Sequence, residues 1–181
     1  HEALADILTK LVLEKKLNHR SPCFSPAICT EFSSNLCNKN CLRLLDNDMK
    51  AGGENYNNYC RDQSFNQSYH KCSQFISGLL WDLRKSIGIK GLLDLIKFAF
   101  TTLDRDGVDF SIFFRSLYAA DKIYLDNKYF CKIKKTLIDR NIKTSDNYLS
   151  NKELDMRSHW YDNLNLNNLY PNKVKRPHCR I

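Results

Sequence analysis

One histidine precedes an apolar helix pattern and could act on a substrate. His70 begins the stretch H-K-C-S-Q-F-I-S-G-L-L-W-D-L-R, in which four apolar residues recur three and four positions apart: Ile76, Leu79, Leu80 and Leu83. That spacing predicts a helix with one buried face. An imidazole at the start of such a helix can point into a cleft and stabilise charge that develops in a transition state. A histidine in this place is also commonly a cap or a packing residue.

Two further polar segments stand upstream of this histidine. Glu2 and Asp6 are four residues apart at the start of another apolar pattern, so they project from one face of a predicted helix. An acidic pair in a first turn is often a solvated cap that the helix dipole favours. Arg43 follows in the segment C-L-R-L-L-D. A guanidinium is always charged and offers several donors, although a surface arginine in a loop is the commoner case.

Taken in order, these segments resemble the thermolysin-like zinc metallopeptidases over residues 1 to about 142, and the W-D-L-R segment resembles the fungalysin-like branch more closely. The resemblance implies that Glu2 binds zinc and that Asp6 orients a histidine ligand of the metal. It implies that Arg43 hydrogen-bonds the substrate carbonyl and that His70 donates to the oxyanion. The D-F-S and A-A-D-K-I-Y segments and the residues up to 142 resemble the last helices of that family and carry no chemistry.

The sequence departs from the family pattern at two places. The family has an aspartate shortly before the histidine, whereas this chain has Phe65 five positions before it and Asp62 as the nearest upstream carboxylate. The zinc-binding H-E-x-x-H motif is absent, because His1-Glu2 is followed by no histidine at position 5. We therefore expect the carboxy-terminal helical lobe of a longer zinc metalloendopeptidase, with Glu2 as its one zinc ligand. The half that carries H-E-x-x-H is expected upstream, and no proteolysis is expected from this lobe by itself.

The fold is predicted to be mainly α, a helical bundle resembling the carboxy-terminal lobe of thermolysin-like peptidases with a Cys-rich loop insertion. A partial peptidase domain over 1–142 would contain the first helix, the Cys-rich loop region 18–69 and the bundle 70–142. A polar, loosely ordered tail would cover 143–181, where Asn and charged residues are frequent. Hydrophobic periodicity predicts the helices 2–17, 71–87 (ending near Gly88), 91–103, 109–122 and 128–141. The expected inward-facing residues include Leu11 and Val12 of the first helix, Phe113, Phe114 and Leu117 of the helix 109–122, and Ile138 of the last helix.

Eight cysteines in 181 residues are more than an intracellular protein of this size usually carries. Their even number and their concentration in a loop-rich region favour disulfides and an extracellular, secreted protein. A structural metal site is the less favoured alternative, because no C-x-x-C knuckle is present. The disulfide pairing does not follow from the sequence.

The net charge and the length of the apolar runs indicate which classes of partner this chain can bind. The formal net charge of +8 is spread along the chain, so we expect weak polyanion affinity and no specific nucleic-acid binding. No apolar run reaches the length of a membrane span. The expected partner is a peptide or protein substrate. Two alternatives stay open: a catalytically dead peptidase-like module that binds peptides, and an unrelated Cys-rich, basic, secreted helical protein that binds polyanions.

Overall fold

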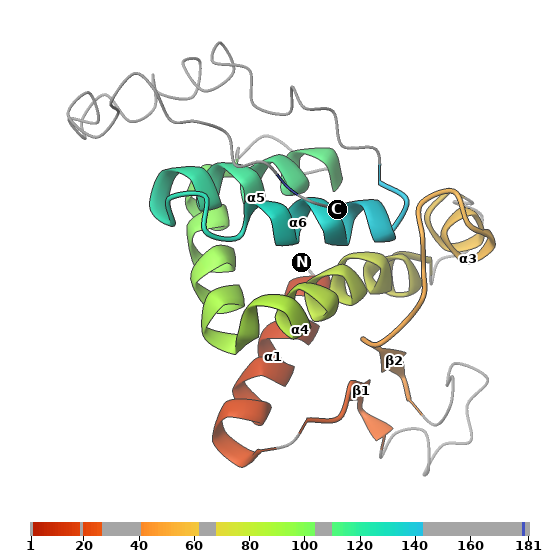
Figure 1. The fold of residues 1–181 in the computed structure, drawn as a ribbon. Helices are drawn as coiled ribbons and strands as arrows, with labels where there is room; N and C mark the ends of the chain where they lie inside the picture. The colour runs from red at the N-terminus through yellow and green to blue at the C-terminus, as the bar shows by residue number, and fades with distance from the viewer. Residues whose placement is uncertain are drawn as a thin grey trace. The chain divides into compact units, whose positions relative to one another are not determined.

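The computed structural model describes residues 2–18, 20–26, 41–61, 68–103, 110–142 and residue 179. This part of the chain is mainly helical with one two-stranded sheet (Figure 1), which confirms the mainly α prediction. The similarity to a peptidase lobe stays a prediction. The elements in chain order are α1 Glu2–Leu17, β1 Cys23–Phe24, β2 Arg43–Leu44, α3 Glu54–Tyr56, a π-helical turn Asn57–Arg61, α4 Ser68–Thr102, α5 Phe110–Tyr124 and α6 Phe130–Asp139.

The chain forms two compact units. The first comprises residues 1–94 and 134–143, and the second comprises 95–133 and 144–181. Large, fully buried side chains form the core of the first unit: Ile7, Leu11, Leu45, Phe75, Leu79, Leu80, Leu83, Leu92 and Leu137. In the second unit, Leu95, Leu117 and Ile133 are buried to the same degree. No helix in the described ranges has the length and apolar character that crossing a membrane requires.

Helix α1 buries a face that carries charge. Its bounds match the predicted helix, and Ile7 and Leu11 are fully buried as the periodicity requires. Val12, which the sequence pattern placed on the same face, is 54% exposed. The buried face instead includes Asp6 and Glu14, each of which pairs with an arginine from another element. Charged partners therefore allow α1 to bury polar positions that an apolar pattern would miss.

Helix α4 changes direction at a glycine. Gly88 has φ 76° and ψ 169°, a backbone conformation outside the helical region that joins two helical segments. Glycine adopts positive φ at no steric cost, which other residues rarely do. The predicted end of a helix near Gly88 is thus confirmed. The predicted apolar stripe before it is buried as well, since Leu79, Leu80 and Leu83 have no exposed surface.

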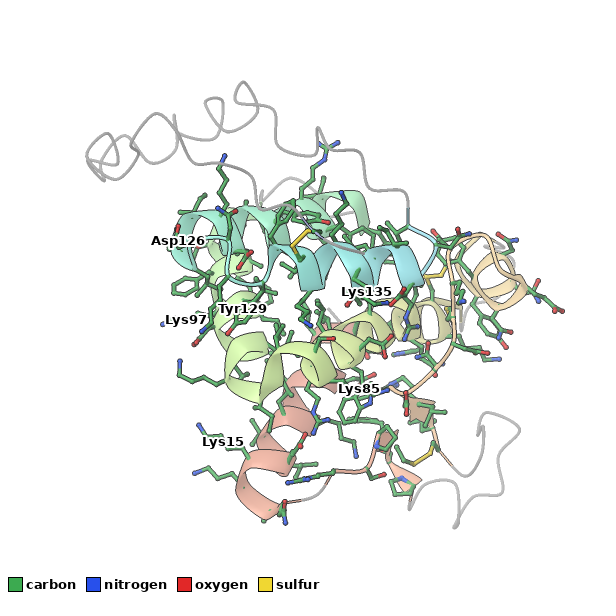
Figure 2. The ribbon with its side chains drawn as sticks, in the orientation of Figure 1. Lys15, Lys85, Lys97, Asp126, Tyr129 and Lys135 are labelled. Carbon is green, nitrogen blue, oxygen red and sulfur yellow. A yellow bond between two sulfur atoms is a disulfide. The ribbon has the colours of Figure 1, made fainter. Side chains whose placement is uncertain are left out.

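The Cys-rich region contains short elements where the sequence predicted only loop. β1 and β2 pair antiparallel, with Cys23 opposite Leu44 and Phe24 opposite Arg43 (Figure 1). Three disulfides join described residues: Cys23–Cys41, Cys60–Cys72 and Cys131–Cys179 (Figure 2). The prediction of disulfides is confirmed for these six cysteines. Cys179 is the one described residue of the predicted tail.

The helices α5 and α6 follow their predicted patterns with one exception. Phe113, Phe114 and Leu117 of α5 are buried, as the periodicity predicts. In α6, Ile133 is buried, but Ile138 is 42% exposed although it was expected to face inward. Position 138 directly follows the buried Leu137 of the same helix, so the two side chains point about 100° apart and one of them meets solvent.

Asp121 of α5 closes the turn that leads to α6. Its Oδ1 accepts a hydrogen bond from the backbone N–H of Tyr129 at 2.9 Å, and its own carbonyl accepts from Asn127. Asp126 and Asn127 take positive φ within this turn, and Figure 2 labels Asp126 and Tyr129 at its two sides. Oδ2 of Asp121 is buried and has no hydrogen-bond partner among the described residues. Burial raises the pKa of Asp121 from 3.8 to about 6.

The stability of the second unit is expected to depend on the ionisation of Asp121. Because its folded pKa is raised, its contribution to stability is full below about pH 4 and is lost as the pH rises through about 6. Asp121→Asn keeps an acceptor for Tyr129 but cannot ionise, so the thermal midpoint should vary less between pH 4 and pH 7. Thermal unfolding across that range measures this, with Asp139→Asn, an exposed carboxylate in a helical ion pair, as the control. An unchanged pH profile in Asp121→Asn would contradict the assignment.

Candidate functional site

A buried ion pair joins α1 to β2. Arg43 donates from Nε to Oδ2 of Asp6 at 2.5 Å and from Nη2 to Oδ1 at 2.7 Å. The side chain of Asp6 is 1% exposed and that of Arg43 is 13% exposed, so water screens the pair little. Burial raises the pKa of Asp6, and the hydrogen bonds and the charge of Arg43 oppose that rise. A two-point contact of this kind fixes both the position and the plane of the guanidinium.

Phe24 packs on the guanidinium of Arg43, and a disulfide joins the segments that carry the two residues. The guanidinium carbon of Arg43 lies 4.7 Å from the centre of the Phe24 ring, which is a cation–π contact. Phe24 is also the residue opposite Arg43 in the strand pair. The disulfide Cys23–Cys41 joins β1 to the residue two positions before Arg43. Since each strand has only two residues, the disulfide and the ion pair supply stability that two short strands lack.

His70 and Glu2 lie side by side at the first turns of their helices. Nδ1 of His70 is 3.2 Å from Oε2 of Glu2, and the two side chains are 39% and 43% exposed. The disulfide Cys60–Cys72 ties the chain two residues after His70 to the π-helical turn. The carbonyl of His70 accepts a hydrogen bond from Ser73 at 2.8 Å. An imidazole and a carboxylate are thus both accessible to a ligand at this place.

The four site residues that the sequence suggested come together in the first unit. Glu2 and Asp6 are one turn apart on α1, and they contact His70 and Arg43 respectively. The charges of Glu2 and His70 also act on the carboxyl of Asp6, the first raising and the second lowering its pKa. Residues from positions 2, 6, 43 and 70 therefore form one cluster, which we call the E-D-R-H cluster. Asp62 lies outside the described residues, and so does Phe65.

Two contacts of the site were not evident from the sequence. Phe24 makes a cation–π contact with Arg43, and Gln74 of α4 accepts a hydrogen bond from the backbone N–H of Leu44. Phe24 follows a cysteine in a region with no clear period, and nothing in the sequence connects it to Arg43. Gln74 carried a usable signal, because it stands four residues after His70 and so shares a helix face with it.

The E-D-R-H cluster offers little to a metal by itself. No group of three His, Cys, Asp or Glu side chains that could hold a metal ion occurs in the described ranges. Glu2 provides one accessible carboxylate, whereas both oxygens of Asp6 accept from Arg43. A catalytic zinc needs three protein ligands. The described residues therefore do not form a complete zinc site, and Glu2 could be at most one member of it.

The arrangement is suited to binding and stabilising a negatively charged or strongly polarised oxygen. A fixed guanidinium and an imidazole are both hydrogen-bond donors, and each lies beside a carboxylate. The comparisons with known proteins add no further guide: no family model, no curated protein and no solved structure matches this chain. The chemistry of the E-D-R-H cluster is consequently the basis on which a function can be proposed.

Proposed function

We propose that this chain is the helical part of a secreted zinc metalloendopeptidase that hydrolyses peptide bonds. The observation that carries the proposal is the convergence of Glu2, Asp6, Arg43 and His70 on one cluster. These residues belong to three separate motifs, the Glu2–Asp6 pair, the Arg43 segment and the His70 segment, which span almost seventy residues. Chance matches to three short patterns would have no reason to meet in space. The disulfides of the described residues are compatible with an extracellular protein.

Each member of the cluster has a distinct part in this proposal. Glu2 would be one ligand of a zinc ion, which when bound would polarise the carbonyl and activate water. The two histidine ligands would come from residues outside this sequence. The resemblance assigns Asp6 the orientation of one of them; in this structure Asp6 holds Arg43 through both of its oxygens, and its side chain is 1% exposed.

Arg43 and His70 act on the substrate. Two of the five N–H donors of Arg43 are directed at Asp6, and the other three are the ones that would meet a substrate carbonyl. The imidazole of His70 donates to the oxyanion that forms when water attacks the peptide. Such donors lower the barrier because the oxygen carries more charge in the transition state than in the substrate.

The zinc content of the whole natural protein tests the role of Glu2. Glu2→Gln should weaken zinc binding by more than about 100-fold, since loss of an outer-shell partner alone costs about 10–100-fold. Elemental analysis after dialysis against a weak chelator measures the bound zinc, and Glu54→Gln, an exposed glutamate of α3, is the matched control. Zinc retained at the parent's level in Glu2→Gln would overturn the assignment.

The proposal also requires an H-E-x-x-H segment in the reading frame that encodes these residues. A complete reading frame without that segment would overturn the peptidase. Peptide binding by such a protein would favour the catalytically dead module instead. Steeply salt-dependent heparin binding without peptide affinity would favour the basic polyanion-binding protein.

A further inference from the structure

The segment that carries Arg43 is hydrogen-bonded both to the residues around β1 and to α4. The backbone N–H groups of Leu42 and Leu45 donate to the carbonyls of Phe24 at 3.1 Å and of Pro22 at 2.9 Å. The N–H of Leu44 donates to Oε1 of Gln74 at 3.1 Å. A side chain of α4 thus accepts directly from the backbone of β2. The hydrogen bond fixes the peptide that joins Arg43 to Leu44.

Asn47 provides a second connection between the same two segments. Its Nδ2 donates to the carbonyl of Leu44 at 2.8 Å and to the carbonyl of Gln74 at 2.9 Å. The side chain reaches the helix backbone because residue 78 is a glycine. A Cβ at Gly78 would lie 2.7 Å from both amide atoms of Asn47, which is closer than van der Waals contact allows. Gln74, Asn47 and Gly78 together form what we call the polar bridge.

The polar bridge connects the two donor residues of the E-D-R-H cluster. Gln74 stands one helical turn after His70, so its side chain projects from the same face of α4. At its other end, the bridge reaches Leu44, the neighbour of Arg43. The ion pair with Asp6 fixes the guanidinium of Arg43, but the backbone of a two-residue strand has little stability alone. The placement of the Arg43 backbone relative to α4 and His70 therefore depends on the hydrogen bonds of Gln74 and Asn47.

We propose that Gln74 is a positioning residue that sets Arg43 relative to His70 for turnover. The inference rests on the proposed function and adds to it a residue that touches neither metal nor substrate. Two donors that act on one substrate must be placed to within a fraction of an ångström. A misplacement of about 1 Å can cost up to about 100-fold in rate.

The test compares two substitutions of Gln74 in the whole natural protein. Gln74→Met keeps the length of the side chain and loses the acceptor for Leu44, so kcat on a fluorogenic peptide should fall about tenfold. Gln74→Glu keeps an acceptor for Leu44, so its kcat should stay close to that of the parent. Thermal midpoints of both variants show whether stability alone accounts for a change. Equal kcat in the parent and Gln74→Met, or equal losses in Gln74→Met and Gln74→Glu, would overturn the proposal.

A double-mutant cycle with Arg43→Ala separates positioning from a general structural effect. If Gln74 acts through Arg43, then Gln74→Met should change kcat little once Arg43 is alanine. Independent losses that multiply in the double variant would mean that Gln74 acts elsewhere.

Failure of the inference and failure of the proposed function give different results. If His70→Ala leaves turnover unchanged or the parent hydrolyses no peptide, the proposed function is wrong. If His70→Ala slows turnover and Gln74→Met does not, only the positioning role of Gln74 is wrong. Hydrogen exchange at the amide of Leu44 gives a readout that needs no activity. Exchange should become faster in Gln74→Met and stay slow in Gln74→Glu, and an unchanged rate in Gln74→Met would show that the bridge does not hold Arg43.

Discussion

Replacing His70 by alanine should lower kcat by about 10²–10³-fold, which is the cost of losing one oxyanion donor in other enzymes. Zinc binding should stay intact. The side chain lies at the exposed start of α4, 3.2 Å from Glu2, and does not belong to the buried core. Its removal therefore takes a donor from the site and leaves the packing of the first unit unchanged. KM should change less than kcat, because the oxyanion exists in the transition state and not in the bound substrate.

Steady-state kinetics on one peptide, together with zinc analysis, would check this expectation. Lys71→Ala is the matched control: Lys71 is the next residue of α4, and its Nζ lies 5.1 Å from the centre of the Tyr59 ring, away from the E-D-R-H cluster. Its kcat should equal that of the parent. A kcat unchanged by His70→Ala would contradict the donor role. Loss of zinc with the activity would mean that His70 serves to hold Glu2 in place.

The helices were predictable because apolar periodicity depends on local sequence. The buried stripe of α5 and the break at Gly88 follow from spacing and from the freedom of glycine. Val12 and Ile138 were misplaced because the neighbouring elements decide which part of an apolar arc is covered. In α1, arginines from other elements made Asp6 and Glu14 the better residues to bury. No single-helix pattern contains that information.

The residues of the candidate site that belong to short motifs could be named from the sequence. Asp6 and Arg43 form a close pair although 37 positions separate them, and the sequence named both. The residues that hold them could not be named, because Gln74 and Phe24 act through contacts between distant segments. The pairing of the cysteines was equally inaccessible. Short motifs thus suggested the candidate residues, whereas the contacts that support them could be seen only in the fold.

Arg140 is a buried residue whose loss should strongly destabilise the first unit. It is 3% exposed and donates to Oδ2 of Asp82 from Nε at 2.9 Å and from Nη2 at 2.6 Å. Its Nη1 donates to Oδ1 of Asn47 and to the carbonyl of Met49, both at 2.9 Å. The backbone takes part too, because the carbonyl of Arg140 accepts from Ala51 at 2.9 Å. One guanidinium therefore donates hydrogen bonds to the carboxylate of Asp82, the side-chain amide of Asn47 and the backbone carbonyl of Met49.

Arg140→Met is expected to reduce the free energy of unfolding of the first unit by about 3 kcal/mol, the lower end of the range for breaking a buried pair. The lower end applies because the Asp82 side chain is 33% exposed and can regain water. Arg140→Lys keeps the charge but cannot make the forked contact with Asp82. Its free energy of unfolding should therefore lie between those of Arg140→Met and the parent. Lys135→Met, which removes an exposed helical ion pair, should cost less than about 1 kcal/mol.

Urea unfolding followed by the fluorescence of Trp81, which is buried in the first unit, would measure these differences in a Trp160→Phe background. Because Arg140 donates to Asn47, its loss should also loosen the polar bridge and speed hydrogen exchange at Leu44. That second effect distinguishes a network from a set of independent bonds. Equal stability of Arg140→Met and Lys135→Met would contradict the network. A loss of stability without faster exchange at Leu44 would mean that Asn47 holds the bridge without help from Arg140.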